Sequence, residues 1–87
     1  MLEELIGQKI VIDTPHSVQY IGKLIRFNAE FVELQDVDVH DANHTKNTKE
    51  QYLIQVARGI SNNNRKKILV KQTTIISLSR LEDILVF

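Results

Sequence analysis

The sequence predicts a mostly β protein, built as a small five-stranded barrel with a short N-terminal helix and a second helix inserted in the later half. The strongest observation is residues 18–25, where apolar and polar side chains alternate with a period of two, as in a half-buried strand. Gly22 stands in the middle of that strand, and a glycine there usually marks a sharp bend. Strong bending of this kind lets a small sheet close into a barrel.

The N-terminal region supplies one short helix and one short strand. Residues 2–6 combine three apolar side chains with two glutamates, and Gly7 is suited to end the helix in the left-handed conformation. The apolar residues 10–12 follow as a strand. Residues 13–17 then form a turn, where Pro15 has no N–H for a strand ladder.

The third strand covers residues 31–39 and follows a short loop around Asn28. Its apolar phase changes between Leu34 and Val37. Since a strand keeps a strict period of two unless a residue is inserted, this change predicts a β-bulge.

Residues 41–65 interrupt the β pattern and predict an insertion that contains a helix. Thr48 with Gln51 fits a capping box, and Asn47 with Glu50 fits one at a shifted register. We expect the helix to bury an apolar stripe made of Tyr52, Leu53 and Val56.

The last two strands are predicted from the aliphatic runs 68–70 and 75–78, which flank the polar residues Lys71 and Gln72. We expect the two runs to pair as a hairpin. The turn lacks the Asn-Gly or Asp-Gly pair that would form a tight hairpin easily. A lysine and an amide at this place fit a turn that has a role besides turning, and they equally fit side chains that are solvated at a hairpin tip.

Composition restricts the class of protein. A chain of 87 residues with 43% hydrophobic and 25% charged side chains fits a single domain, residues 1–87. Because the chain has no cysteine, disulfides and thiolate metal sites are excluded. No segment has the length and apolarity of a membrane span, and the N-terminus lacks the pattern of a signal peptide. We therefore expect a cytoplasmic protein.

Charge is unevenly spread along a chain whose net charge is zero. Residues 1–41 hold three Lys/Arg and eight Asp/Glu, whereas residues 42–80 hold eight Lys/Arg and one Glu. Such asymmetry fits a basic face for an anionic partner, and it equally fits two halves that neutralise each other in the fold.

Two groups of residues carry a resemblance to a known family. The first group is Gly7, Ile10, Ile12, Tyr20, Gly22, Leu24, Asn28, Leu34 and Asp36. The second is the apolar–Lys71–Gln72–apolar segment of residues 68–78. In this order they resemble the two signatures of the Sm-like family, which are small five-stranded (SH3-like) barrels that assemble into rings and bind RNA.

The resemblance implies a single-stranded RNA site at the turn between the last two strands, facing the pore of a homo-oligomeric ring. The residues expected to bind nucleic acid are Asn28, Lys71 and Gln72, with nearby phosphate contacts from Arg65, Lys66 and Lys67. The sequence departs from the family pattern at four places. The loop between the second and third strands is one residue short, and Phe31 or Val32 stands where a base-contacting Asn is usual. The family's Arg-Gly pair is replaced by Lys71-Gln72, and a helix is inserted.

The implied function is a non-enzymatic ring that binds RNA, without a cofactor. The alternative is a ring or barrel that serves as a scaffold for protein–protein contacts and binds no RNA. Serines without a nucleophile-elbow context and only three glycines argue against hydrolase and phosphate-loop chemistry.

A metal site is a weaker expectation. The one cluster of metal-ligand types is formed by His40, Asp41 and His44, with Asp36 and Asp38 upstream. Side chains of this kind at a strand end more often cap the following loop, and we expect no metal here.

Overall fold

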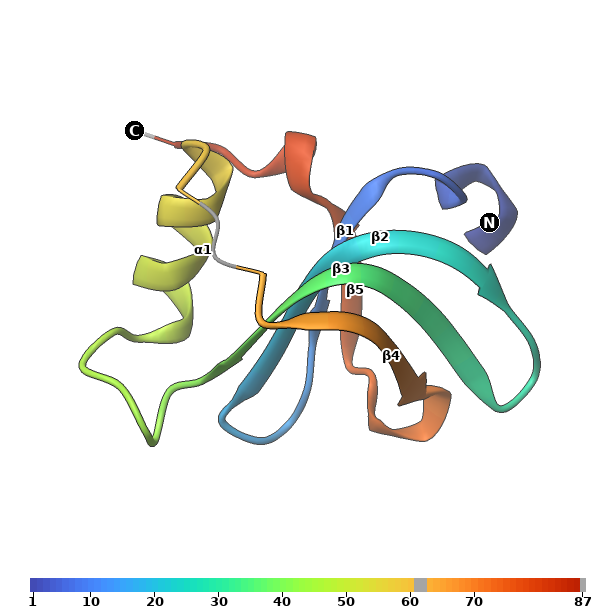
Figure 1. Ribbon diagram of the computed structural model, residues 1–87, viewed down its shortest axis with the longest axis horizontal. Helices are drawn as coiled ribbons and strands as arrows, with labels where there is room; N and C mark the ends of the chain where they lie inside the picture. The colour runs from blue at the N-terminus through green and yellow to red at the C-terminus, as the bar shows by residue number, and fades with distance from the viewer. Residues whose placement is uncertain (61–62, 87) are drawn as a thin grey trace.

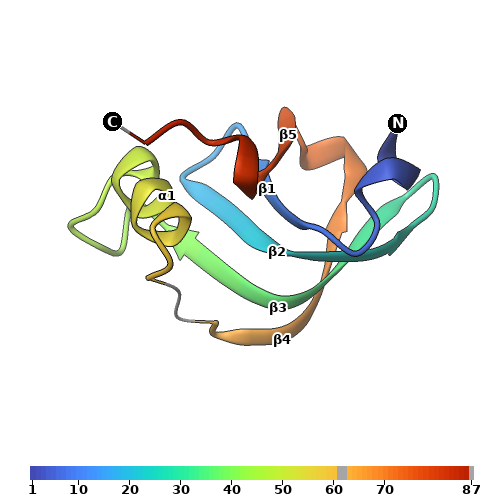
Figure 2. The ribbon, with the colours of Figure 1, turned by 90° about the horizontal axis from the view of Figure 1, so that it is seen from above.

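The computed structural model describes residues 1–60 and 63–86, and its five strands form one antiparallel sheet (Figure 1). The strands are β1 (Lys9–Asp13), β2 (Val18–Phe27), β3 (Phe31–Asp41), β4 (Arg65–Lys71) and β5 (Ser77–Arg80). Their order across the sheet is β4-β3-β2-β1-β5, so β4 and β5 form its two edges. Figure 2 shows the sheet curling from β4 round to β5. The prediction of a mostly β chain with five strands is confirmed.

In the described part of the chain, four short helical segments accompany the sheet: η1 (Leu2–Leu5), α1 (Lys49–Ala57), η2 (Gln72–Thr74) and η3 (Leu81–Asp83). The predicted N-terminal helix is a single 3-10 turn, and Gly7 follows it with a φ of 87°. The Gly7 amide donates to the carbonyl of Leu24 at 2.8 Å, which attaches this segment to β2.

Gly22 and the predicted bulge lie against each other. Asp36 has a φ of 53°, in the left-handed region, and the register between β2 and β3 shifts next to it. A Cβ at position 22 would lie 3.1 Å from Val37 Cγ2 and 3.2 Å from the carbonyl oxygen of Gln35. Glycine therefore lets the two strands approach closely where the sheet bends, and the predicted bulge between Leu34 and Val37 is confirmed.

Apolar side chains pack on both faces of the sheet. The concave face holds the main core, formed by Ile10, Ile12, Leu24, Val32, Leu34, Val37 and Val70. The outer face carries a smaller core beneath α1, formed by Val11, Ile21, Leu53 and Val56. Burying an aliphatic side chain of this size stabilises a fold by about 1.5–3 kcal/mol. The expected burial of the helix stripe against the sheet is confirmed.

Helix α1 begins at the capping box formed by Thr48 and Gln51, at the first of the two registers considered. Lys49 Nζ lies 2.6 Å from Asp13 Oδ1 and donates to the carbonyl of Thr14 at 3.0 Å, which ties the start of the helix to the end of β1. No helix among the described residues has the length and apolarity needed to cross a membrane.

The prediction that residues 68–78 form a hairpin is wrong. Strands β4 and β5 lie at opposite edges of the sheet, β4 beside β3 and β5 beside β1. The polar residues 72–74 form the 3-10 turn η2, and the Thr74 hydroxyl donates to the Lys71 carbonyl at 2.7 Å. This turn carries the chain across the concave face, so no Asn-Gly pair is required. In the described residues no ladder joins β4 to β5, and the sheet is open between these edges.

Candidate nucleic-acid interface

The turn between β2 and β3 is shaped by Asn28. Its side-chain oxygen accepts hydrogen bonds from the backbone amides of Glu30 and Phe31, both at 2.8 Å. Asparagine is favoured here because its side chain can replace a backbone acceptor in a tight turn. The Asn28 side-chain oxygen is therefore engaged within the protein.

Gln72 joins this turn to η2. Its side-chain Nε2 donates to the Asn28 carbonyl, and its backbone amide donates to the Glu30 carbonyl at 2.8 Å. Lys71, one residue earlier, is exposed and pairs across the ladder with Phe31. Directly paired residues point to the same face, so the Lys71 ammonium and the Phe31 ring leave the sheet side by side. Three of the predicted residues, Asn28, Lys71 and Gln72, are thus brought together.

A hollow of about 350 Å³ adjoins this junction and is lined by Arg26, Phe27, Asn28, Phe31, Glu33 and Leu69. Arg26 Nε lies 3.1 Å from Glu33 Oε1, and Glu33 is only 7% exposed. Leu69 remains 58% exposed although it is apolar. The hollow combines an aromatic and aliphatic wall with a guanidinium group, which is the chemistry that stacks on a planar base.

Sequence reasoning missed three residues that line this hollow, namely Arg26, Phe31 and Leu69. Only the position of Phe31, three residues after Asn28 and next to the expected base-contacting site, gave a signal. Arg26 and Leu69 come from β2 and β4, and each is paired or aligned with Glu33 of β3. Their proximity follows from the register of three strands and is not visible in the linear sequence.

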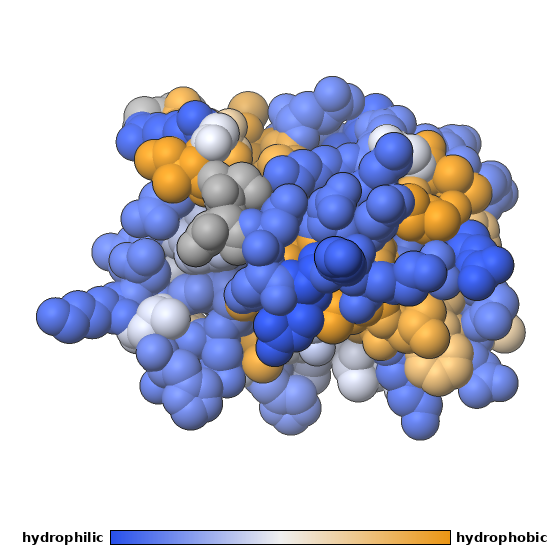
Figure 3. Space-filling view, viewed as in Figure 1, coloured by the Kyte–Doolittle hydropathy of each residue, from blue (hydrophilic) through white to orange (hydrophobic). Residues whose placement is uncertain are grey.

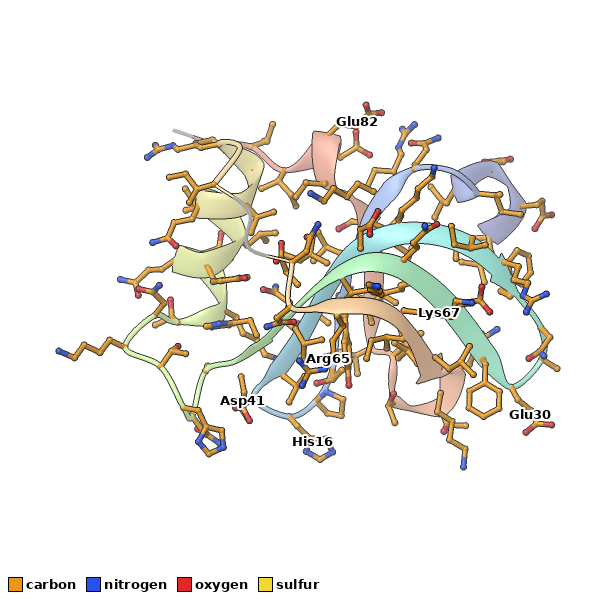
Figure 4. All side chains as sticks on the ribbon, viewed as in Figure 1. His16, Glu30, Asp41, Arg65, Lys67 and Glu82 are labelled. Atoms are coloured by element: carbon orange, nitrogen blue, oxygen red, sulfur yellow. The ribbon has the colours of Figure 1, made fainter. Side chains whose placement is uncertain are left out.

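The predicted phosphate contacts Arg65, Lys66 and Lys67 lie at the other end of β4 from Lys71. At a rise of about 3.3 Å per residue, Lys67 is about 13 Å and Arg65 about 20 Å along the strand from Lys71. Figure 4 shows Arg65 and Lys67 on β4 and Glu30 at the β2–β3 turn. Because side chains alternate, Lys66 points to the opposite face from Lys67. These three residues do not join the junction.

The His-Asp cluster anchors the loop after β3. His40 is buried and stacks on Tyr52, with ring centroids 4.1 Å apart, and its Nε2 lies 3.2 Å from the Asn47 carbonyl. Asp41 accepts from the Ser17 hydroxyl at 2.5 Å, and its other oxygen lies 3.5 Å from His44 Nε2.

These contacts give the cluster a structural role. The Ser17 hydroxyl, followed by the Asn43 backbone amide, lowers the pKa of Asp41 below its ordinary value. Within residues 1–60 and 63–86, no three His, Cys, Asp or Glu side chains converge as a metal site would require.

Comparisons with known proteins identify the fold. Neither a protein-family model nor any curated protein matches the chain. Among solved structures, the chain is similar to that of the Pyrococcus abyssii Sm protein in complex with a uridine heptamer. The TM-score is 0.62 and the sequence identity 11%, over 91% of this chain and 90% of that chain. The chain therefore has an Sm-like fold, as its short motifs indicated.

Proposed function

We propose that this protein is a non-enzymatic Sm-like protein that binds single-stranded RNA at the junction of the β2–β3 turn and η2. The observation that carries the proposal is the pair of hydrogen bonds from Gln72 to Asn28 and Glu30, which holds Lys71 opposite Phe31, a residue that lines the hollow. The similar Sm protein, whose structure holds a uridine heptamer, supports the same class of ligand.

Each group at the junction has a distinct part in the proposed binding. The Lys71 ammonium neutralises a phosphate, and the Phe31 ring offers a face on which a base stacks. Gln72 acts chiefly as a positioning residue, because its amide already bonds to the neighbouring turn. This differs from the expectation that Gln72 would itself bind nucleic acid.

We further propose that copies of the chain assemble into a ring. In the described residues the outer edge of β4 and the outer edge of β5 each lack a partner strand. Free edges pair readily with other chains, and head-to-tail pairing closes into a ring when the rotation allows. A ring repeats the Lys71 site in every subunit, so weak contacts add through avidity.

An alternative function is a scaffold that contacts other proteins and binds no RNA. The observation that favours it is an exposed apolar group near the end of α1 and the C-terminal segment, where Ile60 is 65% and Leu85 74% exposed. Figure 3 shows apolar residues at the surface in this part of the molecule. Absorbance at 260 and 280 nm separates the two functions, because a chain without tryptophan leaves copurified nucleic acid plainly visible.

The proposed function predicts that Lys71→Ala weakens the binding of a labelled uridine-rich or adenine-rich oligoribonucleotide by about tenfold or more, since the loss occurs in every subunit. Fluorescence anisotropy at several salt concentrations measures it, and the log–log salt slope should fall by about 0.7 for each lost phosphate contact. Phe31→Leu, which keeps an apolar side chain and removes the ring, should weaken binding without lowering the salt slope.

Lys46→Ala is the matched control, because Lys46 is an exposed lysine in the loop after β3. If the wild-type protein binds neither oligonucleotide in a salt-sensitive way, the RNA function is wrong. If it binds and Lys71→Ala equals Lys46→Ala, the assignment to the junction is wrong.

A further inference from the structure

The register of the sheet aligns four polar residues in one row across four strands. Lys9 of β1 pairs with Lys23 of β2, Lys23 pairs with Gln35 of β3, and Gln35 pairs with Lys67 of β4. We name these residues the basic row. Neighbouring strands lie about 4.8 Å apart, so the row extends over about 14 Å.

The basic row lies on the outer face of the sheet. Directly paired residues share a face, and the residues adjacent to the row in sequence, Ile10, Leu24, Leu34 and Ile68, pack in or against the main core on the other face. Lys23, Gln35 and Lys67 are exposed and Lys9 is half-buried. Figure 3 shows hydrophilic side chains gathered over the middle of the face that β4 crosses in Figure 1.

Two lysines placed directly opposite each other repel and destabilise a sheet. Lys9 and Lys23 have this arrangement, and none of the ion pairs among the described residues includes a lysine of the row. Glu82, which lies near Lys9, forms its ion pair with Arg80 at 3.4 Å. An anionic ligand would supply the counter-charge that the protein does not place within ion-pair distance.

The surface beside the row is hollowed and leaves room for such a ligand. One hollow of about 350 Å³ is lined by Gly7, Lys9, Lys23, Asp36 and Asn63. A second, of about 520 Å³, lies on the other side of Lys9 and is lined by Gln8, Lys9, Ala57, Leu81 and Glu82. Asp36 is the acidic group that lines the first hollow, and it faces two lysines of the row there.

We propose that the basic row binds the phosphodiester backbone of a single-stranded nucleic acid, at a site separate from the junction of Lys71 and Gln72. The class of ligand rests on the proposed function, whereas the location of the site rests on the register of the strands. Three ammonium groups and one amide in a line match a chain of repeated negative charges. The row offers no aromatic platform, so it binds RNA without regard to base.

The test is the affinity of a fluorescein-labelled oligouridylate and an oligoadenylate of equal length, measured by anisotropy between about 50 and 200 mM salt. Lys23→Gln removes one charge from the row, and Lys46→Gln removes one charge from a distant exposed loop. Between these two salt concentrations the affinity of the wild type falls by some factor, and for Lys23→Gln we expect that factor to be about 2.6-fold smaller, because one phosphate contact is lost. The change should be equal for both oligonucleotides. Lys46→Gln should leave it unchanged.

Folding is checked by thermal unfolding, where Lys23→Gln should unfold no earlier than the wild type, because it relieves the repulsion from Lys9. The proposal is overturned if Lys23→Gln and Lys9→Gln both match Lys46→Gln in affinity and salt slope. If the row variants lose binding while Lys71→Ala does not, the row stands and the junction is wrong. If Lys71→Ala alone loses binding, the junction stands and the row is wrong.

Discussion

Gly22 controls how closely β2 and β3 approach at the bend of the sheet. A methyl group there would lie 3.1 Å from Val37 Cγ2, 3.2 Å from the Gln35 carbonyl oxygen and 3.3 Å from Val37 Cα, and the last two atoms belong to the strand backbone. Strand β3 changes direction at Asp36, whose backbone is in the left-handed conformation. A small side chain at one position and an unusual φ at another together produce the curvature that encloses the main core.

We predict that Gly22→Ala lowers the free energy of unfolding by about 1–3 kcal/mol, the range for overpacking a tight contact. Urea denaturation measures the change. In a Val37→Ala background the same substitution should cost less, because the Cγ2 contact is gone, whereas the Gln35 contact stays. Equal losses in both backgrounds would show that Val37 does not restrict this site.

Tyr52 connects the helix α1 to polar side chains on the outer face of the sheet. Burial first, then the neighbouring Asp38 carboxylate, raises the pKa of Tyr52 above its ordinary value of 10.0. Its ring also covers His40, so one side chain of the helix meets two side chains of β3. The helix is therefore attached through polar contacts at Tyr52 as well as through the apolar stripe.

Because of Tyr52, the stability of the folded state depends on pH, and the direction of the dependence follows from the raised pKa. Because the folded state favours the neutral phenol, the stabilising effect is complete below the ordinary pKa of 10.0 and is lost as pH rises through the raised pKa of Tyr52. In a Tyr20→Phe background, absorbance at the phenolate band should show Tyr52 titrating above the ordinary value. Adding Asp38→Asn should move the midpoint down, and an unchanged midpoint would remove Asp38 as a cause.

For the whole molecule, we expect association to depend on the outer edges of β4 and β5, which lack a partner strand in residues 1–60 and 63–86. Ile76 lies next to β5 and is 63% exposed, although its backbone amide donates to the Asp13 carbonyl at 3.0 Å. Exposed aliphatic side chains beside a free edge favour pairing with another chain, and charged ones oppose it. An assembly would cover both Ile76 and the edges.

We predict native masses that are multiples of 10.0 kDa at micromolar protein concentration. Ile76→Lys should shift the distribution towards the single chain without changing the unfolding of that chain. Ile60→Lys is the control, because Ile60 is similarly exposed, at 65%, but follows α1 and belongs to neither edge strand. A wild-type protein that sediments only as a 10.0 kDa monomer would contradict the ring.

The sequence by itself determined the features that depend on neighbours along the chain. The alternation around Gly22 predicts β2, the phase change between Leu34 and Val37 predicts the bulge, and Thr48 with Gln51 predicts the start of α1. Each is a local preference of the backbone or of a side chain within four residues. Such preferences act before the chain folds and can be seen in a single sequence.

Only the tertiary structure decided which strands and side chains meet across the sheet. The two aliphatic runs around Lys71 look like a hairpin, yet β5 pairs with β1, because burying its side chains on the concave core requires crossing the curved sheet. The contact of Gln72 with Asn28 and the row from Lys9 to Lys67 likewise depend on register between strands far apart in sequence. Register is set by the packing of the whole core, so no short segment contains it.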